Sequence, residues 1–157
     1  MPRGRLIEIL PVPAADAFDL VHDYDRRLDW DTLLQAANLT AGYSEARVGA
    51  VAICKGRWLI GGLSVESRYV SFCPPFVAAV KMTNRPFPFD RFAATIRHRD
   101  IAGSRSSIEY VYTFTTRPRC LRRILDPVVG ALFRRETRRR LRSLREFLVA
   151  RHKPSCA

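Results

Sequence analysis

The chain has 157 residues, of which 47% are hydrophobic, and it carries a formal net charge of +12 from 27 basic and 15 acidic residues. This length suits one domain, predicted over 1–157 with a core of about 4–150 and a tail over 151–157, and such a core can be hollowed into a pocket. No apolar run approaches about 18 residues and no apolar segment follows the first basic residues, which excludes a membrane span and a secretory signal and predicts a cytoplasmic protein.

The four cysteines are scattered along the chain, at Cys54, Cys73, Cys120 and Cys156, with no CxxC pair and no histidine at ligand spacing. We therefore expect free thiols in a reducing compartment rather than a zinc site. The sequence also has no glycine-rich phosphate loop, HExxH motif or EF-hand loop. No metal site and no cofactor are predicted.

The amino-terminal part of the chain predicts a strand at Arg5–Leu10, closed by two prolines, and then two short helices. Apolar residues recur at helical spacing in Ala15–His22, and a second helix at Arg26–Leu33 carries Trp30. Helices this short are not stable alone, so both must pack against another element.

From about residue 38 the hydrophobic period changes from helical to alternating, which is typical of strands. Short turns between the strands and the absence of βαβ alternation predict an antiparallel meander. In the last strand Ile108, Tyr110, Tyr112 and Phe114 share one face, which we expect to face the interior. The candidate strands are Asn38–Glu45, Ala50–Leu59, Leu63–Phe72, Phe76–Asn84, Phe89–Arg99 and Arg105–Thr116.

The longest predicted element is a helix over Arg119–Ala150, bounded by Pro118 and Pro154. Apolar residues recur along it at steps of three and four, which predicts one buried face. They are Leu121, Ile124, Leu125, Val128, Val129, Leu132 and Phe133, followed by Leu141, Leu144, Phe147 and Leu148.

Arginines cover the opposite side of this helix: Arg134, Arg135, Arg138, Arg142 and Arg145 fall together on a helical wheel. Such a face is either simply solvated or attracts an anionic partner, for which an anionic membrane surface is one candidate. No aromatic residues interleave with these arginines, which disfavours nucleic acid. The loop before Phe89 carries Phe87, a candidate lid over a pocket, a candidate membrane contact, or a side chain folded back on its own sheet.

The order strand, two short helices, six strands and long helix resembles the START-like helix-grip fold of the SRPBCC superfamily, in particular its polyketide cyclase/dehydrase and lipid-transport branch. The resemblance implies an α+β fold in which a curved antiparallel sheet of about seven strands wraps the carboxy-terminal helix and leaves an internal hydrophobic site. The matching segments span nearly the whole chain: Pro13–Val21 before Asp23, Trp30, Val48-Gly49, Tyr69–Phe76, Gly103–Tyr110 and Pro127–Leu144.

Large apolar and aromatic residues on the inward faces are the candidates for the ligand-binding wall, since small-molecule pockets are mostly apolar. The same residue types would also fill a solid core, so both interpretations stay open. The candidates are Trp30, Trp58, Tyr69, Met82, Phe92, Tyr110, Tyr112, Leu125, Val129, Leu132 and Phe133.

Two charged residues interrupt the apolar face of the long helix. Glu136 and Arg140 are four residues apart, so they are expected to form an ion pair on one side of the helix. This pair either anchors the polar end of a ligand or meets water at the pocket mouth.

Histidine offers the clearest candidate for acid–base chemistry. His98 shares the strand face of Phe92 and Ile96 and is expected either to act near neutral pH or to be structural. His22 and His152 lie at helix ends and are expected to be solvated.

Three functions compete at this stage. Binding or transport of a small hydrophobic molecule (a lipid, an isoprenoid or a polyketide-like compound) leads, because no catalytic constellation stands out. An aromatase/cyclase-type enzyme would use His98, Tyr110 and Tyr112 as candidate catalytic residues. A peripheral protein would use the arginine face on lipid or nucleic acid. The oligomeric state is not predicted.

Overall fold

A computed structural model describes residues 1–40, 42–57 and 62–152. The elements follow the expected order. They are β1 (Arg3–Leu10), α1 (Ala14–His22), α2 (Arg27–Trp30), β2 (Leu34–Leu39), β3 (Val51–Gly56), β4 (Ser64–Cys73), β5 (Val77–Met82), β6 (Phe89–Ile101), β7 (Arg105–Thr116), the 3₁₀ turn η2 (Arg119–Leu121) and α3 (Arg122–His152).

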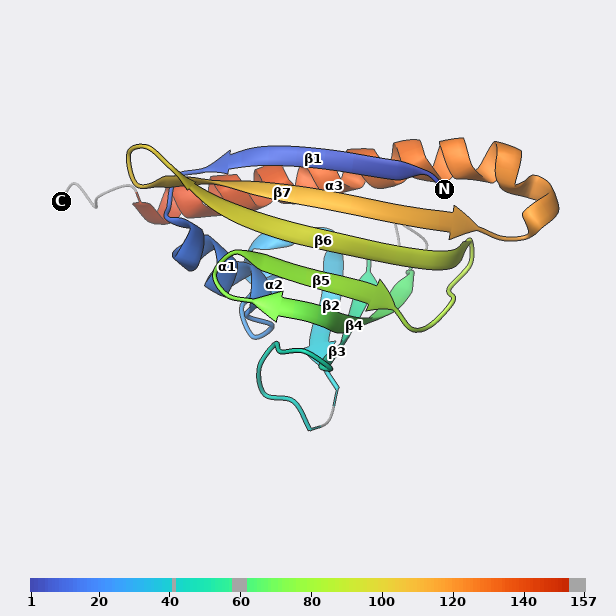
Figure 1. Cartoon of the computed structure of the whole chain (residues 1–157), viewed down its shortest axis with the longest axis horizontal. Helices are drawn as coiled ribbons and strands as arrows, with labels where there is room; N and C mark the ends of the chain where they lie inside the picture. Colours follow the sequence, from blue (N-terminus) through green and yellow to red (C-terminus); the bar gives the residue numbers. More distant parts are fainter. Residues whose placement is uncertain (41, 58–61, 153–157) are drawn as a thin grey trace.

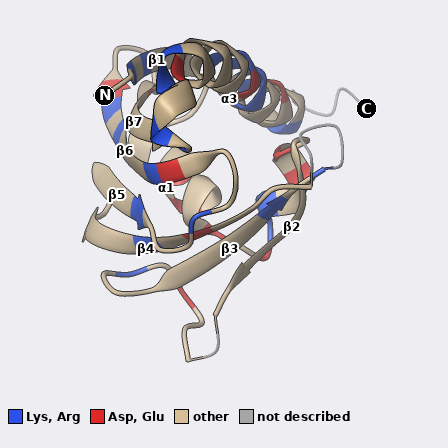
Figure 2. Cartoon of the chain, turned by 90° about the vertical axis from the view of Figure 1, so that its right-hand side faces the viewer, with Lys and Arg blue, Asp and Glu red and all other residues tan. Residues whose placement is uncertain are grey.

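The strands form one antiparallel sheet in the order β1-β7-β6-β5-β4-β3-β2. The sheet curves strongly, so that β2 and β3 cross at a steep angle to β1 and β7 (Figure 1). The helix α3 packs on β1, β7 and α2, on the concave side of the sheet (Figure 2). The predicted architecture, a curved sheet of seven strands beside a long carboxy-terminal helix, is therefore confirmed. Among the described residues, no helix combines the length and the apolar content needed to cross a membrane.

Most predicted bounds shift by one to three residues, and two elements differ more. The second helix is only four residues long, and β2 begins at Leu34 rather than near residue 38. The backbone N–H of Tyr43 donates to the carbonyl of Thr40, and this turn ends β2 after Leu39. The sequence places β2 too late, because the spacing of Leu34, Ala37 and Leu39 does not distinguish a strand from the end of the preceding helix.

The concave side of the sheet, here called the inner face, carries the core as predicted. In β7 the side chains of Ile108, Tyr112 and Phe114 are buried there, and Tyr110 is half-buried. The rings of Tyr112 and Phe133 lie 4.6 Å apart, joining β7 to α3. Buried residues of α1 and α3, among them Leu144, complete the same cluster.

The Tyr112 ring lies across β1 because its cross-strand partner is Gly4. A methyl group at Gly4 would lie 2.2 Å from Cζ of that ring, far inside van der Waals contact. We therefore expect Gly4→Ala to lower the free energy of unfolding by about 1–3 kcal/mol through overpacking. Urea unfolding measures this loss, with Arg3→Ala at the neighbouring exposed position as the control. An equal effect of both variants would contradict the tight packing.

The predicted buried face of α3 is only partly correct in its first half. Leu125, Val129 and Phe133 are half-buried on the inner side, whereas Leu121, Ile124, Val128 and Leu132 are exposed. The start of the helix is fixed by polar contacts, which set its rotation: Arg122 donates to Asp90 at 2.7 Å, and Asp126 accepts from the Thr116 hydroxyl at 2.6 Å. Within the described residues α3 contacts the sheet mainly at β1 and β7, and Val129 and Phe133 of the inner row pack against the core there.

Candidate functional site

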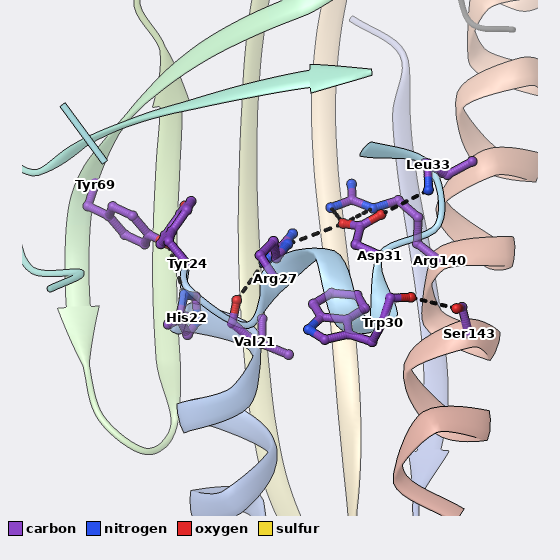
Figure 3. Close-up of polar contacts among 10 residues, drawn as sticks. All are labelled: Val21, His22, Tyr24, Arg27, Trp30, Asp31, Leu33, Tyr69, Arg140 and Ser143. Carbon is purple, nitrogen blue, oxygen red and sulfur yellow. Dashed lines mark hydrogen bonds and ion pairs between the residues drawn. The ribbon is translucent and has the colours of Figure 1, made fainter. Parts of the chain in front are cut away.

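The centre of the candidate site is a buried carboxylate held by two arginines. Asp31, which directly follows α2, is fully buried. Its Oδ2 accepts from Arg140 of α3 through Nη2 at 2.7 Å and Nε at 3.0 Å, and from Nε of Arg27 at 3.2 Å. We call these three residues the ionic centre (Figure 3).

The charges of the ionic centre do not cancel. Burial alone would raise the pKa of Asp31, but the guanidiniums of Arg140 and Arg27 outweigh it and hold that pKa below its usual value. Burial likewise disfavours the charged form of Arg140, and Asp31 reverses this, so the pKa of Arg140 is raised. Two guanidinium cations thus share one carboxylate anion, which leaves a net positive charge beside the inner face.

The ionic centre is fixed by contacts that tie α2 to α3. Arg27 donates to the carbonyl of Val21 and lies over the Trp30 ring, 4.6 Å from its centre. The Ser143 hydroxyl, one turn beyond Arg140, donates to the carbonyl of Trp30. The four-residue helix α2 is therefore held by the tertiary contacts that its length requires.

A second polar group lies deeper under α1. Nδ1 of His22 is 2.9 Å from the Tyr69 hydroxyl, which in turn lies 3.0 Å from the Tyr24 hydroxyl (Figure 3). Burial, Arg27 and His98 together lower the pKa of His22 well below its usual value. Burial also raises the pKa of Tyr69. His22 is thus a buried neutral ring, and the expectation that it is solvated is wrong.

Part of the inner face remains accessible. Val65 of β4, Val80 of β5 and Tyr110 of β7 pack against the core yet keep some exposed surface. The Tyr110 hydroxyl makes no hydrogen bond within the described residues, and burial raises its pKa, with Arg140 and Arg27 acting in the opposite direction. The helix α3 packs on β1, β7 and α2, so Val65 on β4 and Val80 on β5 lie beyond the strands that it covers.

The predicted wall residues divide into three groups. Met82, Phe92, Tyr112, Val129 and Phe133 belong to one core cluster or pack against it, and so do Trp30 and Tyr110. Tyr69 belongs to a second cluster with Phe18, and Leu125 is half-buried on α3. Leu132 is exposed on the outer side, so its predicted interior position is wrong, and Trp58 lies outside the described residues.

The predicted Glu136–Arg140 ion pair is also wrong. Glu136 pairs with Arg139 at 3.5 Å, while Arg140 reaches across to Asp31. Arg140 pairs with Asp31, which is fully buried and also bound by Arg27, whereas the Glu136 side chain keeps 14% of its surface exposed. Arg140 nevertheless faces inward, as the wheel predicted.

His98 does face inward, but it is sealed beneath α1. Its ring lies 5.4 Å from that of Phe18, and neither ring nitrogen has a partner among the described residues. Burial lowers the pKa of His98 to about 4, so the ring is neutral at pH 7. Of the two alternatives, this favours a structural histidine over an acid–base group that titrates near neutral pH.

Two hollows lie outside the inner face. One, of about 460 Å³, is lined by residues such as Lys81, Ala93 and Thr113, which point to the convex side. The other, of about 410 Å³, is a groove between β1 and α3 lined by Arg5, Arg134, Arg138 and Arg142 among others. Within the described part of the chain, no cluster of His, Cys, Asp or Glu could hold a metal ion.

The sequence matches the profile of a family described as polyketide cyclase/dehydrase and lipid transport over residues 7–148. The chain belongs to this family. The polyketide cyclase/dehydrase and lipid-transport family is the branch that the sequence segments resembled, so this prediction is confirmed. No curated protein sequence matches the chain.

Solved structures share the fold over nearly the whole chain. A START superfamily protein from Mycobacterium smegmatis has a TM-score of 0.79 at 8% identity, covering 94% of this chain and 97% of that one. The Zhui aromatase/cyclase from Streptomyces sp. R1128 has 0.78 at 14%, covering 99% and 98%. The protein XoxI from Bacillus cereus has 0.77 at 20%, covering 97% and 99%. At these identities the likeness establishes the fold alone, which is the START-like helix-grip fold.

Most of the polar site is not predicted by the local sequence patterns. Asp31 and Arg27 were placed in a short helix without a role, although their four-residue spacing puts them on one side of a helix. That spacing, next to Trp30, was the available signal for half of the ionic centre. Nothing local pointed to the pairing of Asp31 with Arg140, because 109 residues separate them.

Proposed function

We propose that this protein binds a small hydrophobic molecule, such as a lipid, an isoprenoid or a polyketide-like compound, between the inner face of the sheet and α3. The observation that carries the proposal is the row of partly exposed apolar side chains that includes Val65, Val80 and Tyr110, beside a packed core. Apolar walls with a few convergent polar groups are typical of small-molecule sites. The family description, which joins polyketide cyclases with lipid transport, supports the same class of ligand.

The ionic centre adds a polar requirement to this ligand. Two guanidiniums and one carboxylate leave a net positive charge, which an anionic end group would balance. Arg140 keeps 19% of its side-chain surface exposed, while Asp31 keeps none, so the accessible part of the ionic centre is positive. The ligand is therefore an amphipathic acid, with its chain along the inner face and its carboxylate or enolate against Arg140.

A fluorescent fatty acid tests this proposal. Dansyl-labelled undecanoic acid is expected to gain fluorescence on binding, and dodecanoate to displace it about tenfold better than dodecanol, because a charge-assisted hydrogen bond is lost with the alcohol. Val80→Trp fills the inner face and is expected to abolish binding. Val70→Trp, on the exposed side of β4, is the matched control.

The outcomes separate the parts of the proposal. No fluorescence change with the wild-type protein, or equal binding by Val80→Trp and Val70→Trp, would contradict a ligand on the inner face. Equal displacement by acid and alcohol would retain the hydrophobic site but remove the role of Arg140. Native mass spectrometry of the purified protein supplies an independent measurement of any retained molecule.

A second candidate function is an aromatase/cyclase-type reaction, favoured by one observation. The Tyr110 hydroxyl is unpaired within the described residues and senses the field of Arg140 and Arg27. Such a hydroxyl beside a positive centre could stabilise an enolate. Faster deuterium exchange at the central carbon of an aryl β-diketone, lost in Tyr110→Phe, would support it.

A further inference from the structure

An exposed apolar row runs from the end of η2 along the outer side of α3. Leu121, Ile124, Val128 and Leu132 are exposed by 46%, 66%, 61% and 51%. The last three are spaced by four residues, so they lie along one side of the first turns of the helix. We call these four residues the outer row. A contiguous patch of large apolar side chains on a folded surface usually marks a contact with another body.

Positive charge continues the same side of the helix. Arg135, Arg138 and Arg142 are exposed in the turns directly after Leu132. Figure 2 shows Lys and Arg along both α3 and β1. The groove of about 410 Å³ between these two elements is lined by Arg5, Arg134, Arg138 and Arg142, against a single acid, Glu8. One side of α3 is thus apolar in its first half and strongly basic in its second.

The loop between β5 and β6 adds a further exposed apolar side chain near the start of α3. Phe87 is 64% exposed in the connection between β5 and β6. That connection is joined to the segment before α3, because the backbone N–H of Arg117 donates to the carbonyl of Pro88 at 2.8 Å. Both lie at the same end of the molecule (Figure 1).

We propose that this side of α3 docks on an anionic lipid surface, with the outer row entering the boundary between headgroups and acyl chains and the arginines contacting lipid phosphates. An amphipathic helix that lies in the plane of a membrane interface has this combination of a large apolar row and a basic flank. The charge supports the choice of occupant: with a net charge of +12, a second copy of the chain would bring two arginine faces together, whereas an anionic bilayer neutralises them.

This inference is independent of the proposed function, since it uses the outer side of α3 and the ligand proposal uses the inner side. Together, the two proposals assign the small ligand to the inner side of α3 and the lipid surface to its outer side. A helix whose outer side rests on lipid would place the interior site next to the phase in which hydrophobic molecules dissolve.

Vesicle sedimentation tests the docking. The protein is expected to bind vesicles of phosphatidylglycerol and phosphatidylcholine but not of phosphatidylcholine alone, and to be released by high salt. Serine at Ile124, Val128 and Leu132 together is expected to weaken binding about tenfold or more. Glutamine at Arg135, Arg138 and Arg142 is expected to weaken it similarly.

The control removes the same number of exposed apolar side chains elsewhere: serine at Ile9, Ile53 and Val70, which are exposed on strands. Circular dichroism and urea unfolding confirm that each variant is folded. Equal vesicle binding by the outer-row variant and the control would overturn the proposal, and so would a wild-type protein that ignores anionic vesicles. A wild-type dimer in light scattering that the outer-row variant converts to a monomer would overturn it in favour of self-association.

Discussion

Replacing Asp31 by asparagine is expected to lower the free energy of unfolding by about 3–5 kcal/mol, because it leaves the guanidiniums of Arg27 and Arg140 near each other without a counter-ion in a buried position. The amide has the shape of the carboxylate, so the loss would come from charge and not from a cavity. Urea unfolding at pH 7 measures it. Asp90→Asn is the control, since the Asp90–Arg122 pair is partly exposed and should contribute within about 1 kcal/mol.

A double variant tests whether the charge imbalance is the cause. Arg140→Met combined with Asp31→Asn removes one cation together with the anion, so the double variant should lose less stability than the sum of the two single variants. Additive losses would show that Asp31 and Arg140 act independently, against the shared hydrogen bonds seen at Oδ2.

The second large effect is a loss of stability in mild acid. The pKa of His98 falls from its ordinary 6.5 to about 4 in the folded protein because the ring is buried. An unfolded chain therefore takes up a proton below about pH 6.5 that the folded protein refuses. Stability is therefore highest above about pH 6.5 and decreases as the pH falls towards about 4. Between pH 7 and pH 5, His98 alone is expected to lower the free energy of unfolding by about 2 kcal/mol.

Urea unfolding across this pH range checks the sign and the source. His98→Phe keeps a ring beside Phe18 and should remove much of the pH dependence. His22, whose pKa is also lowered, should leave a second part of it. His152→Gln is the control, because His152 is exposed at the end of α3. An unchanged slope in His98→Phe would contradict a buried neutral ring.

The fold could be predicted from local patterns, and the polar site could not. Alternation in β7 gave the correct inner face, because the side chains of a strand point alternately to its two sides and Tyr110, Tyr112 and Phe114 share one parity. The position of Arg140 on the inner arc of α3 was also readable. Its partner was not, because the contact with Asp31 depends on how a distant four-residue helix sits against α3.

The error on α3 has a physical origin as well. Hydrophobic periodicity identifies the apolar side of a helix, but it does not show which of those side chains contact the rest of the protein. Leu125 and Leu132 are both apolar, yet Leu125 is half-buried and Leu132 is exposed. The hydrogen bonds of Arg122 and Asp126 with Thr116 fix the rotation of α3 about its axis. The apolar side of α3 is wider than the part of the sheet that it contacts, so some of its apolar side chains remain exposed to solvent.

The pairing of β1 with β7 also governs how the chain can assemble. Arg3 lies opposite Thr113, so β1, at the edge of the described sheet, pairs with a strand that is distant from it in the sequence. The segment between the two strands contains the other described strands. The entropic cost of closing so long a loop opposes the pairing until the contacts between β1 and β7 form. Strands β2 to β7 pair in sequence order, so they can form from neighbouring segments, whereas the contact of α3 with β1 requires the long-range pairing as well. We therefore expect the wall of the interior that β1 and α3 build to form late in folding.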